Sequence, residues 1–279
     1  MLPVFYGLMS ALVWGAADFT GGIASRRAGA FRVVLFGELI GTILLLPIAL
    51  AFGGNMLGTL QWMQAALAGA LGSLGLLLLY HALATGTMSI AAPVSALMAA
   101  LLPVVVGSFM EGIPGGLTIT GFAFALMAVW FVSQNSAEPR HILAHLSEIR
   151  LPLLAGIGFG CYFVLIHSAS SDSTLWPMVA SRSGGLTIIL LFMLTRRDSF
   201  KVPGGAWPLI ALNGVLDLGG NAFYIVAGQL ERLDVSAVLS SLYPGATVVL
   251  AWFLLKERLS RTQWVGIGSA FIAIVLFAL

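Results

Sequence analysis

Residues Phe31 to Phe52 read FRVVLFGELIGTILLLPIALAF, a stretch in which Arg32 and Glu38 are the only charged side chains. A helix crosses the hydrocarbon core of a bilayer with about 20 mostly apolar residues, whereas the buried helices of soluble proteins have shorter apolar runs. This stretch is therefore predicted to span a membrane.

The rest of the 279-residue chain has the same character. Hydrophobic residues make up 59% of it and charged residues only 9%, and its mean hydropathy is +1.01. Soluble domains carry about 25% charged residues, so a large soluble domain is excluded. The net charge of +2 comes without a dense basic run, which argues against nucleic-acid binding. The single cysteine, Cys161, cannot form an intrachain disulfide.

Ten apolar runs follow one another, each bounded by Gly, Pro or charged residues. They lie at residues 2–23, 31–52, 61–84, 88–109, 116–134, 151–169, 175–195, 206–228, 235–255 and 262–279. A polar segment separates the first five runs from the second five, and its Ile142, Leu146 and Ile149 share a helical face, as in a helix lying on the membrane surface. We predict a five-helix repeat at 1–134, an amphipathic linker at 135–150 and a second five-helix repeat at 151–279.

The two halves also resemble each other in sequence. An offset of 145 residues aligns several identical residues, namely Trp62 with Trp207, Gly69 with Gly214, Gly75 with Gly220, Ser95 with Ser240 and Gly121 with Gly266. Five helices are an odd number, so the second repeat enters the membrane from the opposite side. The expected fold is an all-α integral membrane protein with ten transmembrane helices, built as two inverted repeats around a central cavity, an architecture of many secondary transporters.

Basic residues gather on the side of the membrane that is reached after an odd number of crossings. They are Arg26, Arg27, Arg32, Arg140, Arg150, Arg196, Arg197, Lys201, Lys256, Arg258 and Arg261, while Arg232 falls on the other side. The positive-inside rule places the basic side in the cytoplasm and both termini outside.

Ionisable side chains within the spans are candidate functional groups, because a charge in hydrocarbon is costly. Four qualify: Asp18, Glu38, Arg182 and Asp217. For Asp18 and Glu38 the alternative is an interfacial charge paired with a nearby arginine, namely Arg26, Arg27 or Arg32. Arg182 could pair with Glu38 across the repeats, or bind an anionic group of a solute through its fork of donors.

A polar stripe runs along the eighth span, where Asn213, Asp217, Asn221 and Tyr224 recur at helical spacing. Such a stripe either holds the bundle together by hydrogen bonds between helices or lines a cavity. Under the second interpretation Asp217, with Asp18 and Glu38, is a candidate for proton coupling.

Aromatic and hydroxyl side chains complete the candidate site. An offset of 149 residues aligns Trp14 with Phe163, and these rings, like Tyr243, could stack on an organic solute or on a cation. The alternative is ordinary packing. Ser240 could add a hydrogen bond, and Pro244 could break the ninth span.

No metal or cofactor site is expected. His141 and His145 have the spacing of two metal ligands, but no third ligand is identifiable. The motifs HExxH, GxSxG and GxxxxGK[ST] do not occur, so no catalytic residues are assigned.

Two segments resemble the EamA-type transporters of the drug/metabolite transporter superfamily: Ser10 to Phe19, SALVWGAADF, and Lys256 to Ala273, KERLSRTQWVGIGSAFIA. The second repeat is closer to the family pattern, through Tyr243, Pro244, Glu257, Trp264 and Gly266. In the first repeat Glu111 and Gly121 are kept, and Ala99 replaces the proline.

This resemblance implies a ten-helix basket with the fifth and tenth helices at the periphery. It also implies transport of small metabolites, amino acids or drugs, often outward. Both termini would then be cytoplasmic, against the charge distribution, so the orientation stays open.

From the sequence we expect a non-enzymatic secondary transporter of the cytoplasmic membrane. It would move a small amphipathic solute by alternating access, with proton coupling or exchange as the candidate driving mechanisms, as a monomer or weak homo-oligomer in the lipid bilayer. Within the spans three acidic side chains stand against one basic side chain, Arg182, which favours a cationic or zwitterionic solute. The alternatives are a membrane-embedded enzyme acting on a lipid-linked substrate and a structural membrane subunit.

Overall fold

The computed structural model describes residues 2–85, 88–132, 146–171, 173–255 and 260–278, and these fold almost entirely into helices. The first half contains α1 (Leu2–Ala28), α2 (Ala30–Phe52), α3 (Thr59–Thr85), α4 (Met88–Met110) and α5 (Gly116–Val132). The second half contains α6 (Leu146–Ala169), α7 (Leu175–Arg196), the short 3-10 helix η3 (Gly204–Ala206), α8 (Trp207–Leu230), α9 (Leu233–Ser240), α10 (Tyr243–Leu255) and α11 (Arg261–Ala278).

These helices have the length and composition of membrane spans. Among the described residues α1, α2, α3, α6, α7 and α8 are each long and apolar enough to cross a bilayer, and α4, α5 and α11 contain shorter apolar helices. Large apolar side chains such as Phe52, Phe109 and Phe253 stand on the surface of the bundle, where lipid would cover them. The predicted multi-pass, all-α membrane fold is confirmed.

The helix bounds differ from the sequence prediction at several ends; α1, for example, extends to Ala28 and not to residue 23. α6 begins at Leu146, so residues 146–150 belong to that helix and not to a separate linker. Residues 133–145, with most of the predicted surface helix and both linker histidines, lie outside the described residues.

The predicted ninth span is divided into α9 and α10, with Ser241 and Leu242 in a turn between them. Pro244 lacks an N–H group and its ring clashes with the carbonyl four residues earlier, which favours a break in the helix at this point. The chain instead bends through tight turns, in which the Gly245 N–H bonds to the Leu242 carbonyl at 2.9 Å.

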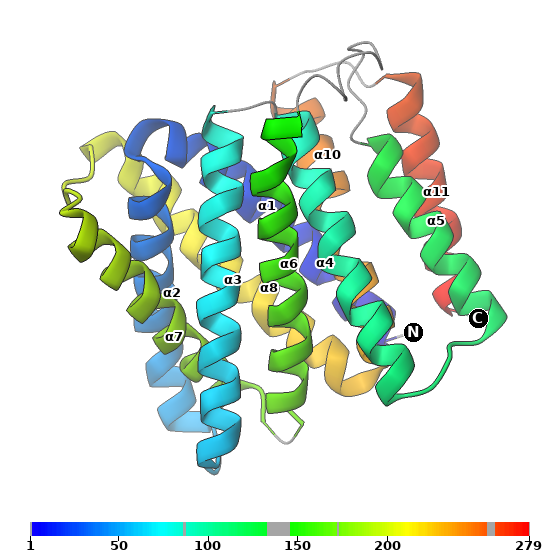
Figure 1. The fold of residues 1–279 in the computed structure, drawn as a ribbon, viewed down its shortest axis with the longest axis horizontal. Coiled ribbons are helices and arrows are strands. Elements are labelled where there is room, and N and C mark those ends of the chain that lie inside the picture. Colours follow the sequence, from blue (N-terminus) through cyan, green and yellow to red (C-terminus); the bar gives the residue numbers. More distant parts are fainter. Residues whose placement is uncertain (1, 86–87, 133–145, 172, 256–259, 279) are drawn as a thin grey trace.

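The two halves pack as related copies. α1 lies along α8 just as α6 lies along α3. α2 contacts both α7 and α8, and α3 contacts α7. α5 pairs with α11 at one edge of the bundle (Figure 1). α1 and α6 start at opposite ends of the bundle, as the odd number of helices in each repeat requires (Figure 1). The repeats are therefore inverted.

Glycines allow the repeats to approach closely. Where α3 crosses α7, a Cβ at Gly69 would overlap the Ser181 carbonyl, and one at Gly184 would overlap the Ala66 carbonyl. Small residues at such crossings let helix backbones pack against each other in a membrane.

Candidate functional site

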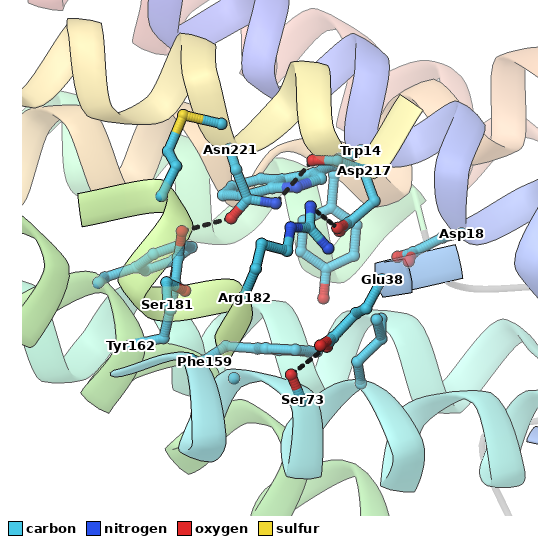
Figure 2. Close-up of a pocket in the computed structure, with 16 residues that line it drawn as sticks. Trp14, Asp18, Glu38, Ser73, Phe159, Tyr162, Ser181, Arg182, Asp217 and Asn221 are labelled. Atoms are coloured by element: carbon cyan, nitrogen blue, oxygen red, sulfur yellow. Dashed lines mark hydrogen bonds and ion pairs between the residues drawn. The ribbon is translucent and has the colours of Figure 1, made fainter. Parts of the chain in front are cut away.

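A cavity lies between the two repeats, close to the middle of the long helices that line it. Its lining is formed by Trp14, Asp18, Glu38, Gly69, Gly72, Ser73, Leu76, Phe159, Tyr162, Phe163, Met178, Ser181, Arg182, Asp217, Asn221 and Tyr243. The unfilled space measures about 750 Å³ with its open mouth included. Figure 2 shows the polar side chains converging on this space.

One side of the cavity carries an ion pair from the second repeat. Arg182 on α7 donates from Nη2 to Oδ2 of Asp217 on α8 at 2.5 Å. The pair is supported by Asn221, whose Nδ2 donates to the Asp217 carbonyl at 2.6 Å and whose Oδ1 accepts from the Tyr162 hydroxyl. Since Arg182 is buried and Asp217 is only 16% exposed, each charge needs the other.

The opposite side carries an acid from the first repeat. Glu38 on α2 is only 5% exposed, and its Oε1 accepts a hydrogen bond from Ser73 on α3 (Figure 2). Its Oε2 is buried and has no hydrogen-bond partner among the residues that the structure describes. A Cβ at Gly185 of α7 would overlap both Oε2 and the Ser73 hydroxyl, so the space for this carboxylate depends on a glycine of the other repeat.

Asp18 on α1 is the third acid of the cavity, and it is 7% exposed. Within the part of the chain that the structure describes, it makes neither a hydrogen bond nor an ion pair. The lining thus holds three carboxylates and a single guanidinium, and that guanidinium is paired with Asp217. The cavity has an excess of acid.

Aromatic rings form one wall beside these charges. Trp14 stacks on Phe163 with centroids 5.6 Å apart, and on Tyr224 at 5.8 Å. Phe163 and Tyr224 are themselves 4.5 Å apart, and Tyr162 joins the cluster from the same helix as Phe163. The result is a continuous aromatic surface next to the ion pair.

The structure brings together eight of the side chains proposed from the sequence. Trp14, Asp18, Glu38, Phe163, Arg182, Asp217, Asn221 and Tyr243 line the cavity. Tyr243 is held by a hydrogen bond of 2.8 Å between its hydroxyl and that of Ser95.

Three proposed residues do not line the cavity. Asn213 donates to the Ala17 carbonyl and to the Tyr80 hydroxyl, each at 2.8 Å. Tyr224 is buried, and its hydroxyl donates to the Phe163 carbonyl at 3.1 Å. Ser240 is fully buried with its hydroxyl unpaired. The first two join helices, which is the packing alternative for the polar stripe.

Within the described ranges, the nearby arginines make no ion pair with Asp18 or Glu38. Arg32 instead donates to the carbonyls of Ala28 and Ser199, each at 2.6 Å. No ion pair joins Arg182 to Glu38 among the described residues; Arg182 pairs within its own repeat. Both acids are therefore buried groups of the cavity and not interfacial charges.

The sequence interpretation missed several lining residues. The polar ones are Ser73, Tyr162 and Ser181, and the others are Gly69, Gly72, Leu76, Phe159 and Met178. A signal for Ser73 does exist, because it follows Glu38 at the same spacing as Asp217 follows Arg182. Tyr162 and Ser181 each adjoin a residue that was proposed, but nothing in sequence alone shows that they face the same space.

A second charged cluster joins the repeats at one end of the bundle. Arg232, between α8 and α9, donates to Asp234 Oδ2 at 2.9 Å and to the carbonyls of Glu111 and Gly112. Glu111 also lies 3.6 Å from Nε2 of His167 on α6. Hydrogen bonds to Asp234 raise the pKa of Arg232 above its usual value, so it stays charged. This cluster, the end latch, ties α4 of the first repeat to the second.

The described residues contain no group of three His, Cys, Asp or Glu side chains that could hold a metal ion. His141 and His145 lie outside the described residues.

Two inverted repeats of membrane-spanning helices around a polar cavity are the architecture of many membrane transporters. The sequence model of the EamA-like transporter family matches the chain twice, at residues 1–134 and 146–279. Because the two matches cover nearly the whole chain, the protein belongs to the EamA-like transporter family. It is a multi-pass membrane transporter.

The comparisons with individual proteins agree with this. The chain is 31% identical over 109 residues to the spermidine export protein MdtI of Cronobacter sakazakii (strain ATCC BAA-894), a match that covers 38% of this chain and 91% of that protein. That relative is thus about 120 residues long, close to the length of one repeat. A solved structure described only as "Crystal structure of protein" shares 15% identity with a TM-score of 0.76, over 99% of this chain and 96% of that one, which shows a common fold.

Proposed function

We propose that the protein is a secondary transporter of the cytoplasmic membrane that moves a small amphipathic solute by alternating access. The observation that carries this is the polar cavity, placed between two inverted repeats near the middle of their helices. Carriers of this architecture bind their solute at the midplane and rock one repeat against the other. The protein would act as a monomer or weak homo-oligomer.

The cavity supplies groups for each part of such a solute. Trp14 and Phe163 would contact its apolar part, and Asn221 and Tyr243 would offer hydrogen bonds. Glu38 would meet a positive charge. Asn213, Tyr224 and Ser240 lie behind this surface and would support it.

The end latch supports the alternating-access part of the proposal. Arg232 and Glu111 close one end of the bundle by joining the two repeats, so opening at that end would require these contacts to break. A charged contact of this kind, partly open to water, is worth little enough to be broken within a transport cycle.

The comparisons favour transport over the enzyme and structural-subunit alternatives, because both the family and the relative are named for transport. The relative's name suggests an exported, positively charged amine. Three carboxylates against a single arginine in the cavity lining fit such a solute.

The test is flux into liposomes that contain the purified full chain. Spermidine, tyramine and lysine, each radiolabelled, are offered under an imposed solute gradient and an imposed pH gradient. We expect saturable flux of at least one, lost in Glu38→Gln and kept in Asp198→Asn, which changes an exposed acid next to Arg196. Flux no faster than in protein-free liposomes for all three contradicts the proposal.

The candidates for proton coupling are Asp217, Asp18 and Glu38. The variants Asp217→Asn and Asp18→Asn are compared for the pH dependence of flux, and because Glu38→Gln is expected to lose flux, Glu38 remains the candidate if neither of these variants loses that dependence. The coupling acid is the one whose replacement removes that dependence. A wild-type pH dependence in Asp217→Asn excludes Asp217.

A further inference from the structure

We infer that the cavity binds the ammonium group of an amine and discriminates against the parent amino acid, which carries a carboxylate beside the ammonium. The inference rests on the proposed transport function and names the substrate class of the same site. It follows from which of the charged groups in the cavity are already paired.

Arg182, the cation that could receive a solute carboxylate, is engaged. Its Nη2 lies 2.5 Å from Asp217 Oδ2, and the two side chains are 7% and 16% exposed. Releasing Arg182 to a solute would leave Asp217 buried without its counter-charge, and an unpaired charge in such a place is strongly unfavourable. A carboxylate entering the cavity would therefore meet a guanidinium whose charge Asp217 already balances.

Glu38, unlike Arg182, has no ion-pair partner among the described residues. One of its oxygens is held by Ser73, and the other is buried without a hydrogen-bond donor. Buried acceptors are seldom left unpaired in folded proteins, and each one that is unpaired calls for an explanation. An ammonium group has three donors and a full positive charge, so it would satisfy this oxygen and balance the carboxylate.

The surroundings of Glu38 strengthen the preference for a cation. Asp18 lines the same cavity, and Trp14 and Phe163 present ring surfaces that attract a cation through their π electrons. A zwitterion would bring its carboxylate close to these acids, where like charges repel.

The cavity also limits the size of the bound group. The space in which the centre of a water molecule fits is only about 80 Å³. At roughly 10–15 Å³ for each water, this is room for a handful of water molecules. The charged head of a small amine fits such a space.

The test compares pairs of ligands that differ only by the carboxylate: tyramine with tyrosine, and cadaverine with lysine. Each is titrated at pH 7.5 into the purified full chain in lipid nanodiscs, and binding is measured by calorimetry. We expect each amine to bind at least tenfold more tightly than its amino acid. Glu38→Gln should weaken amine binding at least tenfold and leave amino-acid binding unchanged, while Asp198→Asn should match the wild type.

Comparison of each pair on the wild-type protein does not depend on whether Glu38→Gln folds. Equal or tighter binding of the amino acids overturns the inference, as does the absence of binding by both amines. Failure of this inference can be distinguished from failure of the proposed transport function. Preferential amine binding without flux in liposomes supports this site and contradicts transport, whereas flux with no preference for amines supports transport and contradicts this site.

Discussion

Each repeat places one pair of polar side chains in the cavity, and the two pairs have the same sequence separation of 35 residues. In the first repeat the pair is Glu38 with Ser73, and in the second it is Arg182 with Asp217. The second pair is neutral as a whole, while the first is an acid with a hydroxyl and holds no cation of its own. The comparison teaches that two copies of one helical framework have taken different electrostatic roles, one shaping the cavity and the other leaving it acidic.

The largest test of this comparison removes the acid of the neutral pair. Asp217→Asn leaves Arg182 buried without a counter-charge, and we expect the free energy of unfolding to fall by about 3–5 kcal/mol. Unfolding from mixed micelles by added SDS measures it. The double variant Arg182→Met with Asp217→Leu should recover most of the loss, because replacing both partners by apolar groups is often nearly neutral. A stable single variant would contradict the ion pair.

A second test changes a residue of the second repeat that packs against Glu38 and Ser73 of the first repeat. Gly185→Ala places a methyl group where Glu38 Oε2 and the Ser73 hydroxyl now lie, and overpacking of this kind costs about 1–3 kcal/mol. Tyramine affinity should fall as the carboxylate is displaced. The matched control is Gly268→Ala on α11, where a Cβ would meet open space. If both variants behave alike, the contact between the repeats at Gly185 is not as described.

A smaller effect is expected from the first pair itself. Ser73→Ala removes the hydrogen bond to Glu38, at a cost of about 1–2 kcal/mol when a buried acceptor loses its donor. The control is Ser108→Ala, because the hydrogen bond that the described part of the chain gives the Ser108 hydroxyl is to the Val104 carbonyl of its own helix, at 2.7 Å. Thermal unfolding in detergent distinguishes the two. A control variant less stable than Ser73→Ala would reverse the expected order.

The smallest effect separates the lining of the cavity from its support. Tyr224→Phe removes the hydroxyl that bonds to the Phe163 carbonyl but keeps the ring stacked on Trp14. Stability should fall by about 1 kcal/mol or less, and tyramine affinity should not change. A loss of affinity would show that Tyr224 contacts the solute after all.

Much of the fold could be predicted from the sequence, because the bilayer imposes a simple rule on length and polarity. The apolar runs give the helices, and an odd number of helices per repeat gives their inversion. The bounds of α6 and the division at Ser241 and Leu242 depend on local backbone geometry, which hydropathy does not report. Pro244 was the available signal for that division.

The site was harder to predict because a polar stripe has two possible neighbours. Asn213, Asp217, Asn221 and Tyr224 share a face of α8, but α1 covers one end of the stripe and α6 the other. Its middle alone borders the cavity. The partner of Arg182 was ambiguous for a similar reason, since helical periodicity does not fix how neighbouring helices are rotated.

The joining of both repeats in one chain has a consequence for how such a cavity can change. If a single repeat assembled with a second copy of itself, each substitution would alter both walls at once. Here the two walls are encoded separately, so an arginine could arise on one side at residue 182 while the aligned position on the other, residue 37, remained glycine. Covalent duplication thus allows the two walls to evolve independently.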